Sequence, residues 1–328
     1  ENMNNTRTLA ATIMAIAMTT SAVGAETLRL LTSWPSSDTL TYAQVEGFKD
    51  AVEAGNADLQ VELNGPEVVP AFEQLQPVKS GVFDLLYTHG AYHAGSRGLG
   101  LVTDVIAPDV DLRRSSGVFA ALDAFYQETH GLKLIAISPL APQGYHCYFR
   151  MPIDPENDWS GLKVRGISSF QGVIAAMGAQ PVAMPFSETY TALDRGVVDG
   201  ACGPSSGMVA TKHYEVAPYR VMPSFGNVDG LFLMNLNRWN GLSDAQKALI
   251  EKVAVTLEHD NLEAGHAYVE NEQSQLENLG VQVVKLSPEN ADIVQDGWVS
   301  HNWQLAETCC GEAATALREL AENAGLTK

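Results

Sequence analysis

The segment Gly203-Pro204-Ser205-Ser206-Gly207 has the Gly-x-Ser-x-Gly spacing that presents a nucleophilic serine in many hydrolases. It follows a predicted strand, and His301 lies later in the chain, so acyl transfer by Ser205 is one hypothesis. Pro204 counts against it, because proline restrains the backbone where a nucleophile elbow needs a strained turn. No histidine–glycine loop upstream is available as an oxyanion hole. We therefore expect no enzymatic activity and keep a serine hydrolase only as an alternative.

Two histidines four residues apart, His89 and His93, are a second chemical possibility, since on a helix both rings would face one side, as in many zinc sites. Gly90 and Gly95 favour a loop at this place. No acidic residue or cysteine that would complete a zinc site is close in the sequence. We expect no metal site and no cofactor, and we leave open a metal ion that bridges a bound ligand.

The four cysteines, Cys147, Cys202, Cys309 and Cys310, do not have the spacing of a zinc site. Cys147 and Cys202 each lie near the end of a predicted strand, so a disulfide between them is one alternative. The adjacent Cys309 and Cys310 are poorly placed to bond each other. The sequence favours separate buried thiols.

The N-terminus has the layout of a secretory signal peptide. Arg7 precedes the apolar or small run Leu9–Met18, and Val23-Gly24-Ala25 offers a cleavage site before Glu26. The apolar run is too short for a membrane span, which needs about 20 residues. We therefore predict that residues 1–25 are removed and that the mature protein is soluble in the periplasm.

The formal net charge is −19, and 45% of the residues are hydrophobic. This hydrophobic content is typical of a chain with a real core. A surface this acidic repels nucleic acid and anionic lipid, so we expect neither as a partner. If the ligand is an anion, arginines inside the molecule must overcome the repulsive field of the surface.

Strand-like and helix-like segments alternate along the chain, which predicts an α/β fold. Ser243 with Gln246 forms a capping box for a long helix, and Ser287-Pro288 begins the last helical region. Strands are expected at 27–32, 59–63, 82–86, 132–138, 145–149, 163–166, 180–184 and 197–202, and helices at 40–53, 72–79, 115–129, 170–177 and 187–195.

The two halves share an internal echo. Ser80-Gly81-Val82-Phe83-Asp84 and Arg195-Gly196-Val197-Val198-Asp199 each follow a predicted helix and place a glycine, an apolar pair and an aspartate at the start of a strand. Because both copies occur in the same helix–strand context, they indicate two lobes built on similar βαβ units.

The chain also carries an ordered set of motifs: Gly161-Leu162-Lys163-Val164-Arg165, Met184–Leu193, Gly196-Val197-Val198-Asp199-Gly200 and Lys212-His213-Tyr214-Glu215-Val216. This set closely resembles the extracytoplasmic receptors of TRAP transporters, the DctP-type solute-binding proteins, and the match extends over essentially the whole chain after the predicted signal peptide. No single motif is decisive, but their order is specific.

The resemblance implies a two-lobed periplasmic-binding-protein (venus flytrap) fold with crossing hinge strands and a long bridging helix. We assign 26–148 and about 236–279 to the first lobe, and 149–235 and about 280–328 to the second. The resemblance also implies a receptor that captures a small organic acid and delivers it to integral-membrane permease subunits. We expect a monomer.

The resemblance makes Arg165 the residue that pairs with the ligand carboxylate. A guanidinium suits this role, because it offers two parallel donors to a carboxylate. Some relatives carry a second basic contact about fourteen residues earlier, and Arg150 lies one residue from that place. Phe186 matches a position where an aromatic ring packs on the ligand.

Gly203 stands where relatives often carry a ligand-contacting asparagine or tryptophan, which either enlarges the pocket or leaves the polar contact to Ser205. The first lobe supplies the opposite wall, because ligands bind at the carboxyl ends of strands in open α/β sheets. We also expect His146 on the opposite face of its strand from Tyr145 and Tyr148. The remaining candidate ligand contacts are Trp34, Glu67, His89, Tyr92 and Tyr145.

Which acid binds stays open. A hydroxy or keto acid, a dicarboxylate, a sugar acid and an aromatic acid all fit the candidate contacts. A sulfonate ligand, or a receptor of another transporter class, is the alternative within the same kind of function.

Overall fold

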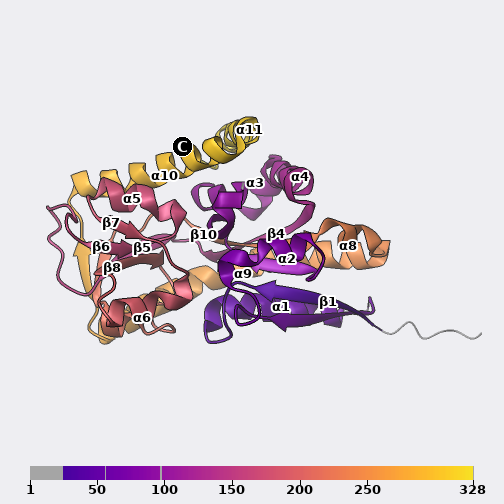
Figure 1. Cartoon of the computed structure of the whole chain (residues 1–328), viewed down its shortest axis with the longest axis horizontal. Helices are drawn as coiled ribbons and strands as arrows, with labels where there is room; N and C mark the ends of the chain where they lie inside the picture. The colour runs from indigo at the N-terminus through magenta and orange to yellow at the C-terminus, as the bar shows by residue number, and fades with distance from the viewer. Residues whose placement is uncertain (1–24, 56, 97, 328) are drawn as a thin grey trace, which may run out of the picture.

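The computed structural model describes residues 25–55, 57–96 and 98–327 of the chain. Two α/β lobes, each built on its own sheet, lie side by side (Figure 1). The predicted fold class is therefore confirmed. Except for Ala25, the predicted signal peptide lies outside the described residues.

The sheet of the first lobe has five strands in the order β2-β1-β3-β10-β4. β1 pairs in parallel with β2 and β3, whereas β10 runs antiparallel to both β3 and β4. The bounds are β1 Glu26–Thr32, β2 Leu59–Asn64, β3 Leu85–Thr88, β4 Leu132–Ala141, β10 Val228–Asn235, α1 Thr39–Ala54, α2 Leu75–Lys79, α3 Val110–Ser115, α4 Val118–His130 and α8 Leu236–Gly241, with 3-10 turns at Ala71–Glu73, Gly90–Ser96 and Leu99–Val105.

The sheet of the second lobe has six strands in the order β11-β9-β5-β8-β6-β7. The chain crosses between the lobes after β4 and returns before β10, so β5 belongs to the second sheet and β10 to the first. The lobe boundaries predicted from the sequence do not follow these two crossings. The bounds are β5 Tyr145–Phe149, β6 Lys163–Arg165, β7 Gln180–Val182, β8 Gly200–Pro204, β9 Tyr219–Met222, β11 Gln282–Lys285, α5 Gln171–Ala176, α6 Thr189–Asp194 and α7 His213–Val216, with 3-10 turns at Ser168–Phe170 and Phe186–Glu188.

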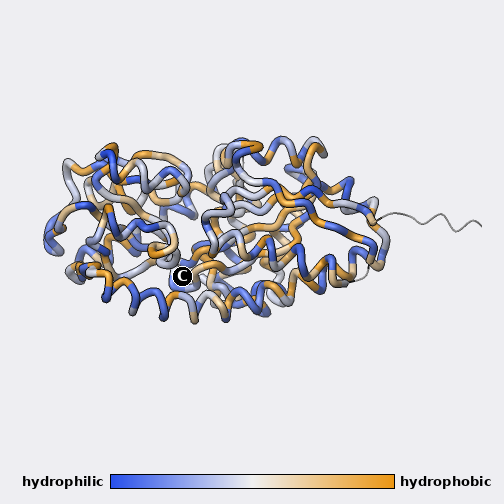
Figure 2. Tube along the Cα trace, turned by 90° about the horizontal axis from the view of Figure 1, so that it is seen from below, coloured by the Kyte–Doolittle hydropathy of each residue, from blue (hydrophilic) through white to orange (hydrophobic). Residues whose placement is uncertain are grey.

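Three helices near the C-terminus connect the lobes. The long helix α9, Asp244–Asn278, begins at the predicted capping box of Ser243 and Gln246, and it runs along the lower edge of Figure 2 beneath both lobes. Helix α10, Pro288–Cys310, packs on α5 of the second lobe and on the 3-10 turn Leu99–Val105 of the first. It leads into α11, Glu312–Asn323, which packs on α4.

Two buried glutamates of α9 hold one lobe each. The Glu258 carboxylate accepts the backbone N–H of Ile137 in β4 at 2.7 Å. The Glu272 carboxylate accepts the N–H groups of Gly207 and Val209 after β8, both at 2.8 Å. Burial raises the pKa of both carboxyl groups. The same rigid helix therefore fixes the central part of both lobes.

The sequence motif that the two halves share has the same local structure in both, but the strands that follow it, β3 and β8, begin later than predicted. Gly81 and Gly196 adopt positive φ values of 79° and 68°, and Val82 and Val197 after them are exposed. β3 and β8 start only after the aspartate of each copy. Each aspartate accepts a backbone N–H of the neighbouring strand, Asp84 that of Arg29 and Asp199 that of Lys163, both at 2.8 Å. The shared motif is thus a turn that ties two strands together.

The expectation of separate buried thiols is wrong. Cys147 and Cys202 stand directly opposite each other in the antiparallel pair β5–β8, with Cα atoms 4.0 Å apart, and form a disulfide. Cys309 and Cys310, at the end of α10, are also bonded to each other. Only the strand register brings Cys147 to Cys202, and this register is not visible in the spacing of the cysteines.

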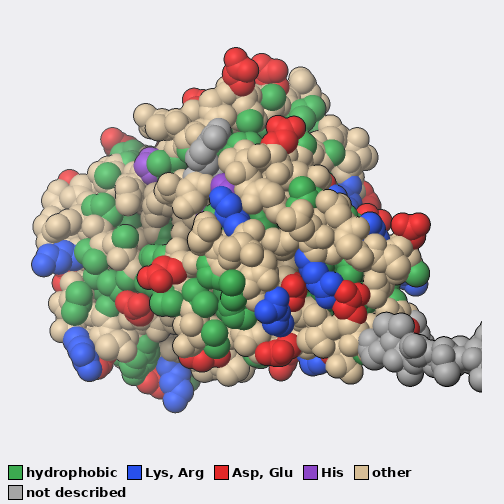
Figure 3. All heavy atoms as spheres, turned by 45° about the vertical axis from the view of Figure 1, so that its right-hand side comes forward, with side chains coloured by type: hydrophobic (Ala, Val, Ile, Leu, Met, Phe, Trp, Pro, Cys, Tyr) green, Lys and Arg blue, Asp and Glu red, His purple; other side chains and the backbone are tan. Residues whose placement is uncertain are grey.

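Hydrophobic segments run through the inside of each lobe, and hydrophilic ones lie mainly outside (Figure 2). Acidic and basic side chains are interspersed on the face shown in Figure 3. Among the described residues, no helix is both long enough and apolar enough to span a bilayer.

Replacing both Cys147 and Cys202 by alanine should lower the free energy of unfolding. The bond closes a loop with a sequence separation of 55, and a loop of this length corresponds to about 4 kcal/mol of chain entropy in the unfolded state. Urea titration of the oxidised proteins measures the difference.

Alanine at both Cys309 and Cys310 is the matched control, because their sequence separation of 1 restricts the unfolded chain very little. Equal losses in the two double variants would contradict this explanation.

Candidate functional site

A narrow cleft with an internal volume of about 30 Å³, partly open to solvent, lies between the lobes. The first lobe contributes the loop after β1, the start of α1 and the segment after β3. The second lobe contributes β5, β6, the Phe186 turn and the end of β8. The lining residues are Trp34, Asp38, Leu40, Thr41, His89, Tyr92, Leu140, Tyr145, Arg165, Ile167, Phe170, Phe186, Pro204, Ser206, Gly207 and Val228.

Arg165 ends β6 and reaches the cleft with only 2% of its surface exposed. Its Nε and Nη2 donate to the carbonyl oxygen of Met184 at 3.1 and 2.8 Å, and its Nη1 donates to that of Cys202 at 2.9 Å. A guanidinium has five N–H groups. Three are used here, so one N–H on each terminal nitrogen remains for a further acceptor.

The charge of Arg165 has no counterion among the residues that the structure describes. Arg113 is buried to a similar extent, yet it forms an ion pair with Asp229 at 2.8 Å. The groups that Arg165 contacts, the carbonyls of Met184 and Cys202 and the Tyr92 hydroxyl, are neutral, and burial lowers its pKa. A buried cation without a counterion is costly, which makes this cleft a candidate site for an anion.

Phe186 forms part of the wall next to Arg165. The guanidinium carbon lies 5.6 Å from the centre of the Phe186 ring. A Cβ atom at Gly203 would approach the same ring to 2.9 Å and the Tyr148 hydroxyl to 3.1 Å. Phe186 and Tyr148 thus fill the space that a side chain at position 203 would need. The glycine at this position therefore does not enlarge the cleft.

Aromatic rings of the first lobe form the opposite wall. The ring centres of Trp34 and Tyr92 are 5.8 Å apart. The Tyr92 hydroxyl accepts the backbone N–H of Phe186 at 3.4 Å, and the Ser168 hydroxyl donates to the Ala91 carbonyl oxygen at 3.2 Å. These two hydrogen bonds join the lobes at the cleft, so the structure has the lobes closed.

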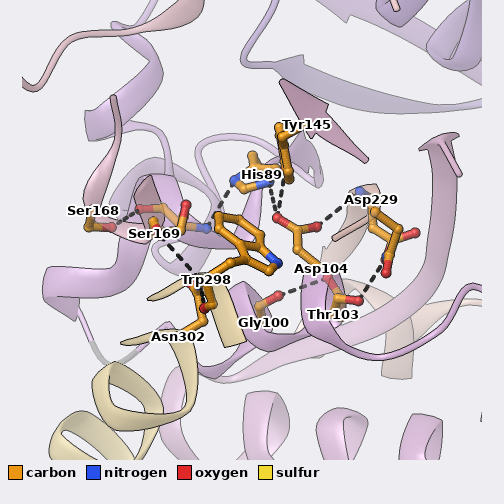
Figure 4. A network of polar contacts seen from close by, with 12 residues as sticks. His89, Gly100, Thr103, Asp104, Tyr145, Ser168, Ser169, Asp229, Trp298 and Asn302 are labelled. Carbon is orange, nitrogen blue, oxygen red and sulfur yellow. Dashed lines mark hydrogen bonds and ion pairs between the residues drawn. The ribbon is translucent and has the colours of Figure 1, made fainter. Parts of the chain in front are cut away.

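Figure 4 shows a buried network where the first lobe meets the hinge strand β5. The Tyr145 hydroxyl donates to Asp104 Oδ2 at 2.7 Å, and His89 Nε2 lies 2.7 Å from the same oxygen. His89 Nδ1 accepts the N–H of Ala91 at 3.2 Å. Because Nδ1 accepts this N–H, Nε2 is the ring nitrogen that donates to Asp104.

The prediction that His146 lies on the opposite face of β5 from both tyrosines is wrong for Tyr148. His146 and Tyr148 lie on the same face, with ring centres 5.2 Å apart. Tyr145 lies on the other face, against Phe170 at 4.8 Å. Side chains two positions apart share a face of a strand, so His146 has to lie with Tyr148 and opposite Tyr145.

Several predicted contacts do not line the cleft. Arg150 and Glu67 are exposed at other places on the lobes. Ser205 is buried beside the cleft, and its hydroxyl has no hydrogen-bond partner among the described residues. His301, the proposed base of a serine hydrolase, instead has Nε2 3.1 Å from the Ser168 carbonyl oxygen. The structure thus pairs no histidine with Ser205.

The two histidines of the hypothetical zinc site contact different residues. His93 Nε2 lies 3.0 Å from the Thr88 hydroxyl, whereas His89 contacts Asp104. In the part of the chain that the structure describes, no group of three or more His, Cys, Asp or Glu side chains could hold a metal ion.

Asp38, Thr41 and Ser206 are the polar residues of the cleft that sequence reasoning missed. Asp38 caps helix α1 by accepting the N–H of Thr41 at 3.3 Å, so in the sequence it reads as an ordinary cap. Ser206 lines the cleft with a buried hydroxyl that has no partner among the described residues. The only feature of the sequence that could have pointed to Ser206 is that it directly follows the candidate Ser205.

His213 should make the protein less stable in acid. Its Nδ1 lies 2.9 Å from the Tyr148 hydroxyl, and burial together with the positive charge of Arg165 lowers its pKa to about 3. Below pH 6.5 the unfolded chain takes up a proton that the folded protein refuses until about pH 3, so stability falls through this window.

Between pH 7 and pH 5 the native protein should lose about 2 kcal/mol more stability than His213→Gln. Urea titrations at the two pH values measure the loss, with His266→Gln, on the exposed face of α9, as the control. The same loss in the native protein and His213→Gln would refute the assignment.

Comparison with known proteins agrees with this geometry. Residues 31–297 match the family described as bacterial extracellular solute-binding protein, family 7. The C4-dicarboxylate-binding periplasmic protein DctP of Rhodobacter capsulatus is 35% identical over 126 residues, which span 38% of this chain and 37% of the relative. The monocarboxylate 2-oxoacid-binding periplasmic protein of a Nostoc species is 26% identical and covers 81% of this chain and 75% of its own length.

Among solved structures, a TRAP periplasmic solute-binding protein from Desulfovibrio desulfuricans with bound sn-glycerol-3-phosphate has the same fold. The TM-score is 0.80 at 18% identity, and the alignment covers 92% of this chain and 98% of the other. Since the family match extends over most of the sequence, this chain belongs to family 7 of the bacterial extracellular solute-binding proteins, the DctP-type receptors that its motifs resemble.

Proposed function

We propose that this receptor captures a small organic acid by closing its two lobes and binds the carboxylate with Arg165. The observation that carries the proposal is the buried guanidinium, which faces the cleft without a counterion among the described residues. Its two remaining N–H groups match a carboxylate, and a charge-assisted pair of this kind is strong and directional.

Closure couples affinity to conformation. With the lobes apart, water reaches Arg165, and the ligand carboxylate docks on the second lobe. When the first lobe closes, Trp34 and Tyr92 cover the ligand, and the exclusion of water strengthens the ion pair. The hydrogen bonds from Phe186 to Tyr92 and from Ser168 to Ala91 support this mechanism, because they form only between closed lobes.

The biological role follows from the family. We propose that the protein works in the periplasm after removal of residues 1–25 and hands its ligand to the membrane permease of a TRAP transporter. The names of the relatives, a C4-dicarboxylate-binding and a 2-oxoacid-binding protein, support an organic acid as the ligand class. A sulfonate is the alternative anion, because it presents oxygens of similar geometry to Arg165.

Arg165→Ala should fold normally but lose affinity for the ligand by roughly a hundredfold or more, because a charge-assisted pair is removed from a desolvated site. Folding should survive, since no buried carboxylate loses its partner. A thermal-shift screen of carboxylates, sulfonates and neutral solutes identifies the ligand through a saturable rise in Tm, and calorimetry then gives the affinity of each variant.

Arg150→Ala is the matched control, because it removes an exposed arginine outside the cleft and should leave the affinity unchanged. Equal affinity of Arg165→Ala and the native protein would overturn the assignment. Hydrolysis of a generic ester that Ser205→Ala abolishes would favour the hydrolase instead.

A further inference from the structure

The charges that line the cleft balance each other. Of the lining residues, Arg165 is the cationic one and Asp38 the acidic one. The ring nitrogens of His89 are engaged away from a ligand, since Nδ1 accepts the N–H of Ala91 and Nε2 contacts Asp104. Arg150, the candidate second cation, is exposed outside the cleft. An acid that fills this cleft therefore meets one positive and one negative group.

Asp38 is placed to contact a ligand. It is only 7% exposed, and it lines both the cleft and the adjoining hollow toward Tyr190 and Lys212. One carboxylate oxygen accepts the N–H of Thr41. No residue that the structure describes forms an ion pair with Asp38, and Lys212 is an exposed side chain of the hollow. The Thr41 hydroxyl also bonds to this carboxylate, but a carboxylate has about four acceptor positions, so Asp38 can accept a further donor at the mouth of the cleft.

A dicarboxylate fits this arrangement poorly. Its first carboxylate would occupy Arg165, and its second would be enclosed with Asp38 and aromatic rings without a cation of its own. Enclosing two like charges costs several kcal/mol, which is the usual way in which a site rejects a wrong ligand. The cleft instead needs a donor or a positive group at the end of the ligand that lies away from Arg165.

The aromatic wall suits such a positive group. Trp34 and Tyr92 lie with ring centres 5.8 Å apart, and Phe72 packs edge-on against Tyr92 at 4.9 Å. Faces of tryptophan and tyrosine attract organic cations, most strongly where water is excluded. Trp34, Asp38 and Tyr92 line the same cleft, so the carboxylate and the rings can act on one ligand.

We propose that the ligand is a zwitterion, whose carboxylate binds Arg165 and whose ammonium or other organic cation lies between Asp38 and the Trp34–Tyr92 wall. This inference rests on the proposed function, because it names the class of acid that the same cleft takes. Asp38 is then the residue that determines specificity: it selects zwitterions and excludes dicarboxylates.

The test compares probes that share one carboxylate and differ at the other end. Short ω-amino acids and their N-trimethylated forms are titrated by calorimetry against dicarboxylates and plain alkanoates of the same chain length. The variants are Asp38→Asn and Arg165→Ala. Asp109→Asn is the control, because Asp109 is an exposed helix cap that accepts the N–H of Leu112 at 2.9 Å, and it carries the same charge change outside the cleft.

We expect the native protein and Asp109→Asn to bind a zwitterionic probe at least about tenfold more tightly than the matched dicarboxylate. Asp38→Asn should weaken the zwitterion and strengthen the dicarboxylate, each by roughly tenfold, so that the preference disappears. The gain for dicarboxylates is a separate readout, because it depends on relieved repulsion and not on the shape of any zwitterionic probe.

The inference is overturned if dicarboxylates bind best to the native protein and Asp38→Asn leaves their affinity unchanged, while Arg165→Ala still abolishes binding. In that case the proposed function stands without it. If no organic anion binds and Arg165→Ala behaves like the native protein, the proposed function itself fails.

Discussion

The whole arrangement of the cleft depends on one buried guanidinium that the protein does not neutralise. Arg165 is held by the carbonyl groups of Met184 and Cys202, which fix its orientation but leave its charge without a partner among the described residues. Arg113, by contrast, forms an ion pair with the Asp229 carboxylate. An unpaired buried cation is costly, and in the proposed function the cost is recovered when an anion enters the cleft. The proposed specificity and the proposed coupling to lobe closure both follow from this constraint.

The rest of the fold keeps that guanidinium in place. The disulfide between Cys147 and Cys202 joins β5 to β8 directly behind the Arg165 contacts. Helix α9 fixes the loop after β8 through Glu272 and the first sheet through Glu258. In the proposed function, the second lobe is the half-site for the anion. The first lobe supplies the aromatic cover and, in our further proposal, Asp38 as the group that recognises the other end of the ligand.

Much of this could be predicted from the sequence, and what could not has physical reasons. Arg165 and Phe186 lie in motifs that identify the family, and the capping box at Ser243 and the Ser287-Pro288 start located the long helices. Arg150 follows a correctly predicted strand, but nothing in the sequence says that its side chain is exposed. The disulfide between Cys147 and Cys202 depends on strand register. Asp38 was missed because a cleft residue that also caps a helix has the same sequence signature as any cap.

The most direct test of this account is a crystal structure of the protein with the acid that gives the largest saturable shift in Tm. The account predicts closed lobes and a ligand anionic group within hydrogen-bond distance of both terminal nitrogens of Arg165. An acid that binds elsewhere, with Arg165 still bonded only to Met184 and Cys202, would contradict it.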